Sequence, residues 1–260
     1  MQRDGTATVG DGMGSGALGT GAAAGLWSAV RSGAEREWGP LARAIRTGTR
    51  GRGLAAMPLT VCATFAILAF QVWQQSASGA AAVEQLGVVR ASLPPGVALS
   101  RTPLSLFVPA PDLPVWGAAL QVFLVFGIAE LTLGRVRTLA IAYAATLAGT
   151  MYARVGIAMG PDRFFGLSYN AEFARDTGPS VAVVALGVCI AWRYRARLTG
   201  AVVVAAMVAE ALALPNLAGA EHLVAILTAL SMSLGAELVE RQTRRTTAAV
   251  NALLLVRRRI

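Results

Sequence analysis

Ser180 and His222 are the two residues whose types and positions could carry nucleophilic chemistry. Ser180 ends the run Asp176-Thr177-Gly178-Pro179-Ser180, directly before an apolar segment, and His222 is the chain's one histidine. A serine hydroxyl is a weak nucleophile until a neighbouring base takes its proton, and histidine commonly supplies that base. The pair is therefore our candidate catalytic dyad, with Ser180 as nucleophile and His222 as general base.

The residues before Ser180 predict the start of a helix. Residues 176–178 offer capping groups, and Pro179 suits the first turn, where its missing N–H needs no partner. The apolar segment Pro179–Trp192 has about 14 residues and covers about 21 Å of a hydrocarbon layer ~30 Å thick. With Trp192 anchored at one surface, Ser180 lies roughly 10 Å below the other. Free backbone N–H groups there could stabilise an oxyanion, and they require a pocket lined by water or protein.

The composition indicates a membrane protein. Hydrophobic residues make up 55% of the chain and charged residues 14%, where soluble domains have about 25% charged residues. All the basic residues are arginine. They lie at helix ends and in the tails, so we interpret them as topology signals and not as a nucleic-acid surface. Cys62 and Cys189 lie in apolar runs, so we expect neither a disulfide framework nor a zinc site. With one histidine in the chain, we expect no protein metal site.

Six segments are predicted to form an all-α, polytopic bundle of transmembrane helices. They are Met57–Gln74, Leu113–Leu131, Thr138–Met159, Pro179–Trp192, Thr199–Leu217 and His222–Val239. The arginines outside these segments number 18 on one side and four on the other. Because positive charge is retained in the cytoplasm, both termini are predicted to be cytoplasmic in a multi-pass protein of the plasma membrane.

The regions outside the membrane domain 57–239 are predicted to be simpler. Residues 1–25 are rich in Gly and Ala and resemble a disordered tail rather than a signal peptide. Residues 26–56 form a basic amphipathic cytoplasmic segment, divided at Gly39-Pro40, that either lies on the inner leaflet or is a solvated linker. Residues 240–260 are a basic cytoplasmic tail.

The motifs around Ser180 and His222 resemble those of the rhomboid family. Gly178-Pro179-Ser180-Val181 is similar to the GxSx motif at the start of the fourth rhomboid helix. His222, followed by Ala225 and Ala229, is similar to the histidine of the sixth helix with its small residues one and two turns later. Such small residues allow close helix approach. The run from Asp176 to Ser180 looks especially like that of divergent actinobacterial rhomboid-like proteins.

A second group of residues extends the resemblance. Glu130 with Gly134, followed by Arg137 and Tyr143, is similar to the rhomboid pattern that joins the second and third helices. The resemblance covers residues 57–239. It implies a six-helix rhomboid-like fold with cytoplasmic termini, and an intramembrane serine protease without metal or organic cofactor.

The predicted second helix departs from the rhomboid pattern. Rhomboid proteases carry an HxxxN pair there whose side chains help to stabilise the oxyanion, whereas this chain has Pro114 and Ala118. Gln121, one turn further on, is a weak substitute. Val181 replaces the glycine that commonly follows the serine, which narrows the pocket. Loss of one oxyanion donor typically costs about 10²–10³ in rate.

Two functions stay open from the sequence. One is a protease that cleaves transmembrane segments, and the other is a catalytically inactive rhomboid-like protein that binds client transmembrane helices. The predicted partners are the lipid bilayer and transmembrane proteins, without nucleic acid. A small transporter would be expected to show internal repeats, which the sequence lacks. Glu210, within the fifth predicted helix, has a functional role or is hydrogen-bonded between helices.

Overall fold

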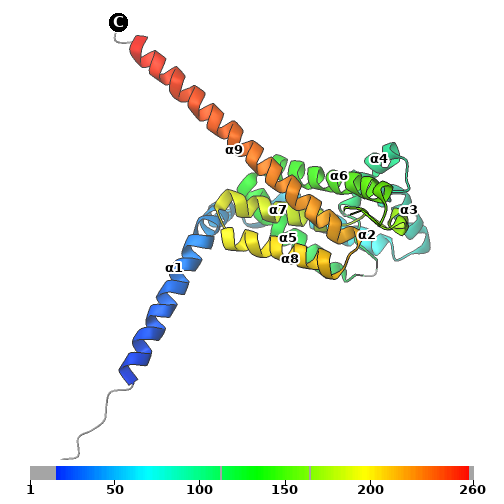
Figure 1. Cartoon of the computed structure of the whole chain (residues 1–260), viewed down its shortest axis with the longest axis horizontal. Coiled ribbons are helices and arrows are strands. Elements are labelled where there is room, and N and C mark those ends of the chain that lie inside the picture. The colour runs from blue at the N-terminus through cyan, green and yellow to red at the C-terminus, as the bar shows by residue number, and fades with distance from the viewer. Residues whose placement is uncertain (1–15, 112, 164, 258–260) are drawn as a thin grey trace, which may run out of the picture.

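The computed structural model describes residues 16–111, 113–163 and 165–257, and these form a bundle of α-helices (Figure 1). Two short 3-10 turns, η1 (Gly53–Ala56) and η2 (Tyr169–Phe173), join longer elements. The α-helices are α1 (Gly16–Thr49), α2 (Pro58–Trp73), α3 (Ala77–Gly87), α4 (Pro95–Ser105), α5 (Val115–Leu133), α6 (Arg135–Met159), α7 (Ser180–Tyr194), α8 (Arg197–Ala213) and α9 (Leu217–Arg257).

The predicted all-α class is confirmed for the described residues. Within the part of the chain that the structure describes, two helices are long and apolar enough to cross a membrane: α5 and the Leu217–Ala248 part of α9, each with a mean hydropathy of 1.7. α2 and α7 are shorter apolar helices. Each of the six predicted segments corresponds to one helix, α2 or α5 to α9, while the number of membrane spans stays a prediction.

The boundary between α8 and α9 differs from the prediction. α8 ends at Ala213, before the predicted Leu217, because Pro215 disfavours helical backbone at the residue before it. α9 begins at Leu217, one turn earlier than predicted, and continues through the predicted basic tail to Arg257. This last part of α9 extends away from the bundle (Figure 1).

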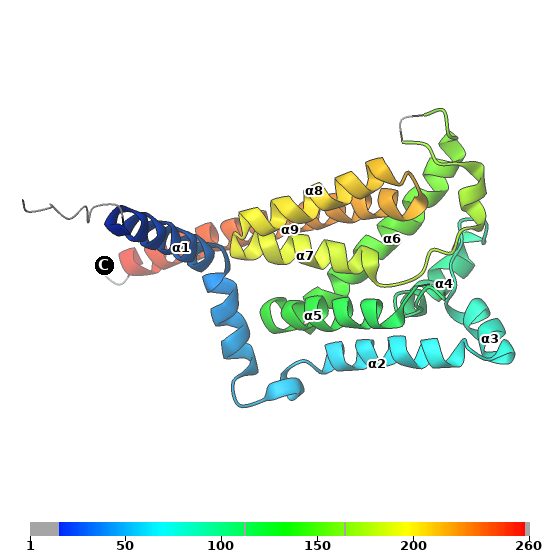
Figure 2. The same ribbon diagram turned by 90° about the horizontal axis from the view of Figure 1, so that it is seen from below.

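The N-terminal region is more helical than predicted. Of the predicted disordered tail, residues 1–15 lie outside the described residues, whereas residues 16–25 belong to α1. The alanines at 22–24 favour helix there. α1 also continues through Pro40, which we expected to divide it. Figure 2 shows that α1 bends sharply instead, as expected for a proline inside a helix.

α7 is the central helix of the bundle. It contacts α5, α6, α8 and α9, and nine of its 15 residues are buried. In Figure 2, α8, α7, α5 and α2 follow one another across the molecule. α5 and α8 therefore both pack against α7 but make no substantial contact with each other.

The two ends of the bundle differ in character (Figures 1 and 2). One end, here called the basic end, carries the projecting parts of α1 and α9 and the arginine-rich connections α5–α6 and α7–α8. The other, the loop end, carries α3, α4, residues 160–163 and 165–179, and the α8–α9 turn. At the basic end, α1 bridges α8 and α5: Glu37 Oε1 accepts the Thr199 N–H at 2.8 Å, and Gly48 lies against Leu131.

A buried glutamate holds the start of α2. Met57, at the N-cap, provides no side-chain cap. Instead, the Glu130 carboxylate of α5 accepts hydrogen bonds from Leu59 N at 3.1 Å, Thr60 N at 2.8 Å, Thr60 Oγ1 at 2.9 Å and Arg135 Nε at 3.0 Å. The Glu130 side chain is 1% exposed. Because first-turn N–H groups lack intrahelical partners, this one side chain joins α2 to the α5–α6 turn.

The substitution Glu130→Ala is expected to lower the free energy of unfolding, since each buried donor left unpaired costs roughly 1–3 kcal/mol. The measurement is thermal or denaturant unfolding of the purified protein in detergent. Glu35→Ala is the control, because Glu35 forms an exposed pair with Arg31 and should change stability by less than about 1 kcal/mol. Equal stability of the two variants would contradict this role of Glu130.

Candidate functional site

A pocket of about 270 Å³ lies at the loop end, where α7 begins. Ser180 lines it, together with Val181 and the residues directly before α7. Polar side chains reach this pocket from α4, α6, the α8–α9 turn and α9. They belong to Ser105, Thr146, Asn216 and Glu221.

The backbone before Ser180 fixes the start of α7. Gly178 has φ +106°, a conformation that side chains disfavour, and its N–H donates to Ser105 O at 2.9 Å. Pro179 is the N-cap and Ser180 the first helical residue, so the predicted helix start is confirmed. The expected side-chain cap from Asp176 or Thr177 is not formed. The first-turn N–H groups of α7 are therefore left without a side-chain acceptor.

Asp176 points to α6 instead of capping α7. Its Oδ2 accepts a hydrogen bond from Thr150 Oγ1 at 2.6 Å. Burial raises the pKa of this carboxyl, while the Thr150 hydrogen bond and the charge of Arg154 lower it. Arg154 also donates to the carbonyls of Ala91 and Leu93, each at 2.8 Å. Arg154 thus connects α6 to the loop that follows α3.

Glu221 is a pocket residue that sequence reasoning missed. It is 4% exposed, and its Oε1 is buried without a hydrogen-bond partner. It lines the Ser180 pocket together with Asp176. A carboxyl directly before the only histidine, at the start of an apolar helix, was the available signal. The Ser180 pocket is consequently lined by two carboxyl groups.

His222 is buried but does not line the Ser180 pocket. Its Nδ1 lies 3.1 Å from Glu210 Oε2 of α8, and its Nε2 has no hydrogen-bond partner. The predicted hydrogen bond between Ser180 and His222 is therefore absent from this structure. Successive helical residues point about 100° apart. With Glu221 turned to the pocket, His222 is directed toward α8.

The helices that carry Ser180 and His222 nevertheless pack closely. Ala225 and Ala229 of α9 are fully buried, and Cys189 Sγ of α7 lies 3.6 Å from Ala229 O.

The remaining predicted residues lie away from the pocket. Gln121 is half-buried on α5 and does not line the pocket, and Pro114 is the N-cap of α5. Glu130 caps α2 as described, and Gly134 joins α5 to α6 with φ +85°. Glu130 and Gly134 are thus structural residues in this fold.

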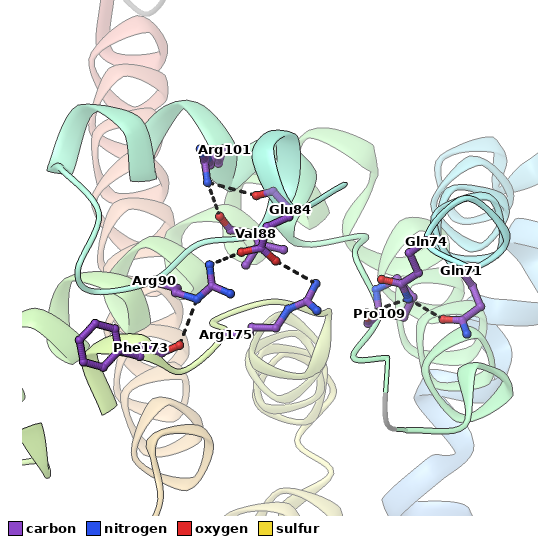
Figure 3. A network of polar contacts seen from close by, with 9 residues as sticks. All are labelled: Gln71, Gln74, Glu84, Val88, Arg90, Arg101, Pro109, Phe173 and Arg175. Atoms are coloured by element: carbon purple, nitrogen blue, oxygen red, sulfur yellow. Dashed lines mark hydrogen bonds and ion pairs between the residues drawn. The ribbon is translucent and has the colours of Figure 1, made fainter. Parts of the chain in front are cut away.

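A polar network holds the loops around the pocket (Figure 3). The Glu84 carboxylate of α3 pairs with Arg90 and, at 3.8 Å, with Arg175. Arg90 Nε donates to Phe173 O at 3.0 Å. These contacts tie α3 to residues 173–175 and so restrain the chain directly before Asp176.

No family model, curated protein or solved structure matches this chain. The likeness to rhomboids rests on the motif residues themselves. Of these, Ser180 and His222 lie near the starts of α7 and α9, two helices that are in contact.

The substitution Thr150→Val is expected to loosen the segment before α7, because it removes the donor to the half-buried Asp176 carboxyl group. Hydrogen–deuterium exchange should speed up for the amides of Asp176 and Gly178, which donate to Val89 O and Ser105 O. Thr228→Val is the control, because the Thr228 hydroxyl bonds only to Val224 O of its own helix. Unchanged exchange in Thr150→Val would show that this hydrogen bond does not hold the loop.

Proposed function

We propose that this chain is a rhomboid-like, multi-pass protein of the plasma membrane that binds transmembrane segments of client proteins and does not cleave them. The observation that carries the proposal is the engagement of His222 Nδ1 by Glu210, with no imidazole nitrogen bonded to Ser180. A serine without a base remains a weak nucleophile. The Ser180 pocket then binds the client segment without cleaving it.

The charge distribution supports the membrane placement. The connections at the basic end carry Arg135 and Arg137 between α5 and α6, and Arg193, Arg195 and Arg197 around the α7–α8 turn. Arginines beside apolar helices mark the cytoplasmic face. The basic end is accordingly cytoplasmic in our proposal, and the Ser180 pocket opens toward the outer face.

One side of α7 offers a path for a client helix. Ser180, Val183 and Gly187 follow each other at helical spacing and are only half-buried, within a helix that is otherwise mostly buried. A Cβ added at Gly187 would meet nothing within 4 Å. The flanking helices α5 and α8 leave a side of α7 uncovered, since they do not pack on each other. Because this row of residues includes a glycine, a client helix can approach the α7 backbone closely.

The pocket chemistry favours binding over acyl transfer. In place of the HxxxN donors, the Ser180 pocket has the carboxyl groups of Asp176, which accepts the Thr150 hydrogen bond, and of Glu221, whose Oε1 has no partner. Neither group is held as a hydrogen-bond donor to a developing oxyanion. The same groups and the uncapped N–H groups of α7 suit a client segment that has a broken helix or a cationic side chain. The absence of donors at Pro114 and Ala118 agrees with this function.

Intramembrane proteolysis is the second candidate, and one observation favours it. A carboxylate on Nδ1 with a free Nε2 is the arrangement of a general base and its orienting group. Once rotated toward Ser180, His222 would take the hydroxyl proton, Ser180 would attack the scissile carbonyl, and His222 would return the proton to the leaving amine.

Site-specific photocrosslinking tests client binding. With benzoylphenylalanine in place of Leu217, which lines the Ser180 pocket, the protein should crosslink to a co-expressed single-span model client that has a Gly-Pro break near its outer end. The same photoprobe at Val136, an 82% exposed position at the basic end, is the control. Equal crosslinking at both positions would contradict docking at the pocket.

Proteolysis is tested on the same model client. The wild-type protein should neither cleave it nor react with a fluorophosphonate probe above the level of Ser180→Ala, and Ser180→Ala should keep the Leu217 crosslink. Cleavage that is lost in both Ser180→Ala and His222→Ala would establish the protease and overturn the non-cleaving function.

A further inference from the structure

A second pocket, of about 390 Å³, lies at the basic end between α6, α7 and α9. It is far from Ser180 in the bundle, since it is lined by the first turns of α6 and the last turns of α7. Five arginines converge on it from three helices, against two glutamates, Glu237 and Glu240, so three positive charges are in excess. The arginines are Arg137, Arg193, Arg195, Arg241 and Arg244, and we call the site the arginine pocket.

Most of this positive charge has no protein partner. Glu237 accepts hydrogen bonds from Trp192 Nε1 at 2.9 Å and from Arg241 Nη2 at 3.2 Å, and Glu240 pairs with Arg244 of the next turn. Within the described part of the chain, Arg137, Arg193 and Arg195 form no ion pair. Three guanidinium groups are thus available to an anion.

The backbone at Arg195 is unusual. Arg195 follows α7 with φ +56°, and Ala196 N donates back to Ala191 O at 2.9 Å. This is the position at which helices normally carry glycine, because a side chain is disfavoured there. An arginine at this strained position contributes charge to the pocket that the fold alone does not require.

The inner part of the arginine pocket is apolar. Leu133, Ile141, Cys189 and Met232 line it beneath the arginines. An exclusively ionic ligand would leave this surface unfilled. An amphiphile with an anionic group and a hydrocarbon chain would satisfy both halves.

We propose that the arginine pocket binds the phosphate of an anionic phospholipid, with part of an acyl chain against the apolar residues. Arginine guanidinium groups donate paired hydrogen bonds to phosphate oxygens, and basic pockets between helices on the cytoplasmic side bind such head groups. The inference rests on the membrane placement of the proposed function and not on client binding. A soluble phosphate ester has the same anionic phosphate but no acyl chain.

The test uses the full chain in zwitterionic detergent, titrated with phosphatidylglycerol, phosphatidylcholine or glycerol phosphate, with native mass spectrometry counting bound lipid. One phosphatidylglycerol should be retained per chain and should raise Tm, whereas phosphatidylcholine and glycerol phosphate should not. The triple variant Arg137→Gln/Arg193→Gln/Arg195→Gly should weaken phosphatidylglycerol binding roughly 100-fold, at ~1 kcal/mol for each arginine. Arg50→Gln, a charge removed outside the arginine pocket, should change binding less than twofold.

Two further measurements distinguish a loss of lipid binding from a loss of stability and from a loss of client binding. Arg195→Gly alone should weaken binding severalfold while its lipid-free Tm stays at or above that of the wild type, because glycine fits this backbone. The triple variant should keep the Leu217 crosslink, so failure of lipid binding and failure of client binding are distinguishable. Equal phosphatidylglycerol affinity of wild type and triple variant would overturn the proposal, as would competition by glycerol phosphate at the lipid's own affinity.

Discussion

The need to satisfy backbone N–H groups at helix starts within an apolar bundle shapes this structure. Such groups have no intrahelical acceptor, and within a bilayer no water replaces one. Neither α2 nor α8 has a side-chain cap at its own N-cap residue. In each, a glutamate from another helix accepts a hydrogen bond from a first-turn N–H group: Glu130 in α2 and Glu37 in α8. These two caps join α2 to α5 and α1 to α8, so the capping requirement also fixes how the helices are arranged.

α7 has no such glutamate at its start, and the candidate site follows from this. Its first turn has no side-chain cap, because Asp176 turns to Thr150 and no glutamate reaches the N-terminus from another helix. The uncapped turn opens to the pocket that Ser180 shares with Glu221. Glu221 lies on the face of α9 that is turned to this pocket. The next residue, His222, is therefore turned to α8, where it bonds to Glu210. The same local geometry therefore creates a polar pocket and leaves the His222 imidazole bonded to Glu210 and not to Ser180.

The sequence predicted the helices well, because their signals are local. The apolar run, Pro179 and the glycine before it sufficed to place the start of α7, and α2 and α5 lie within two residues of their predicted bounds. The effects of two prolines were predicted wrongly. α8 ends before Pro215, earlier than predicted, whereas α1 bends and continues through Pro40, where we expected a division. α3 and α4 were not predicted, since the connection between α2 and α5 has only short amphipathic runs.

The site was harder to predict because it depends on the rotation of helices about their axes. The sequence paired His222 with Ser180 as a dyad, but a turn of about 100° decides whether residue 221 or 222 faces the pocket. Thr150 and Arg154 act on Asp176 across the bundle, a contact that residue spacing cannot reveal. Glu130 was recognised from a motif, yet its role as the cap of α2 required knowing that α2 and α5 are neighbours.

Water access to the start of α7 tests the central claim most directly. In a background of Cys62→Ser and Cys189→Ala, a cysteine placed at Ser180 should react with a small, charged, membrane-impermeant thiol reagent added from the outer face. A cysteine placed at Ala185, which is fully buried one turn further along α7, should not react under the same conditions. Labelling of Ser180→Cys only by an apolar reagent, or only from the cytoplasmic face, would contradict a polar pocket at an uncapped helix start.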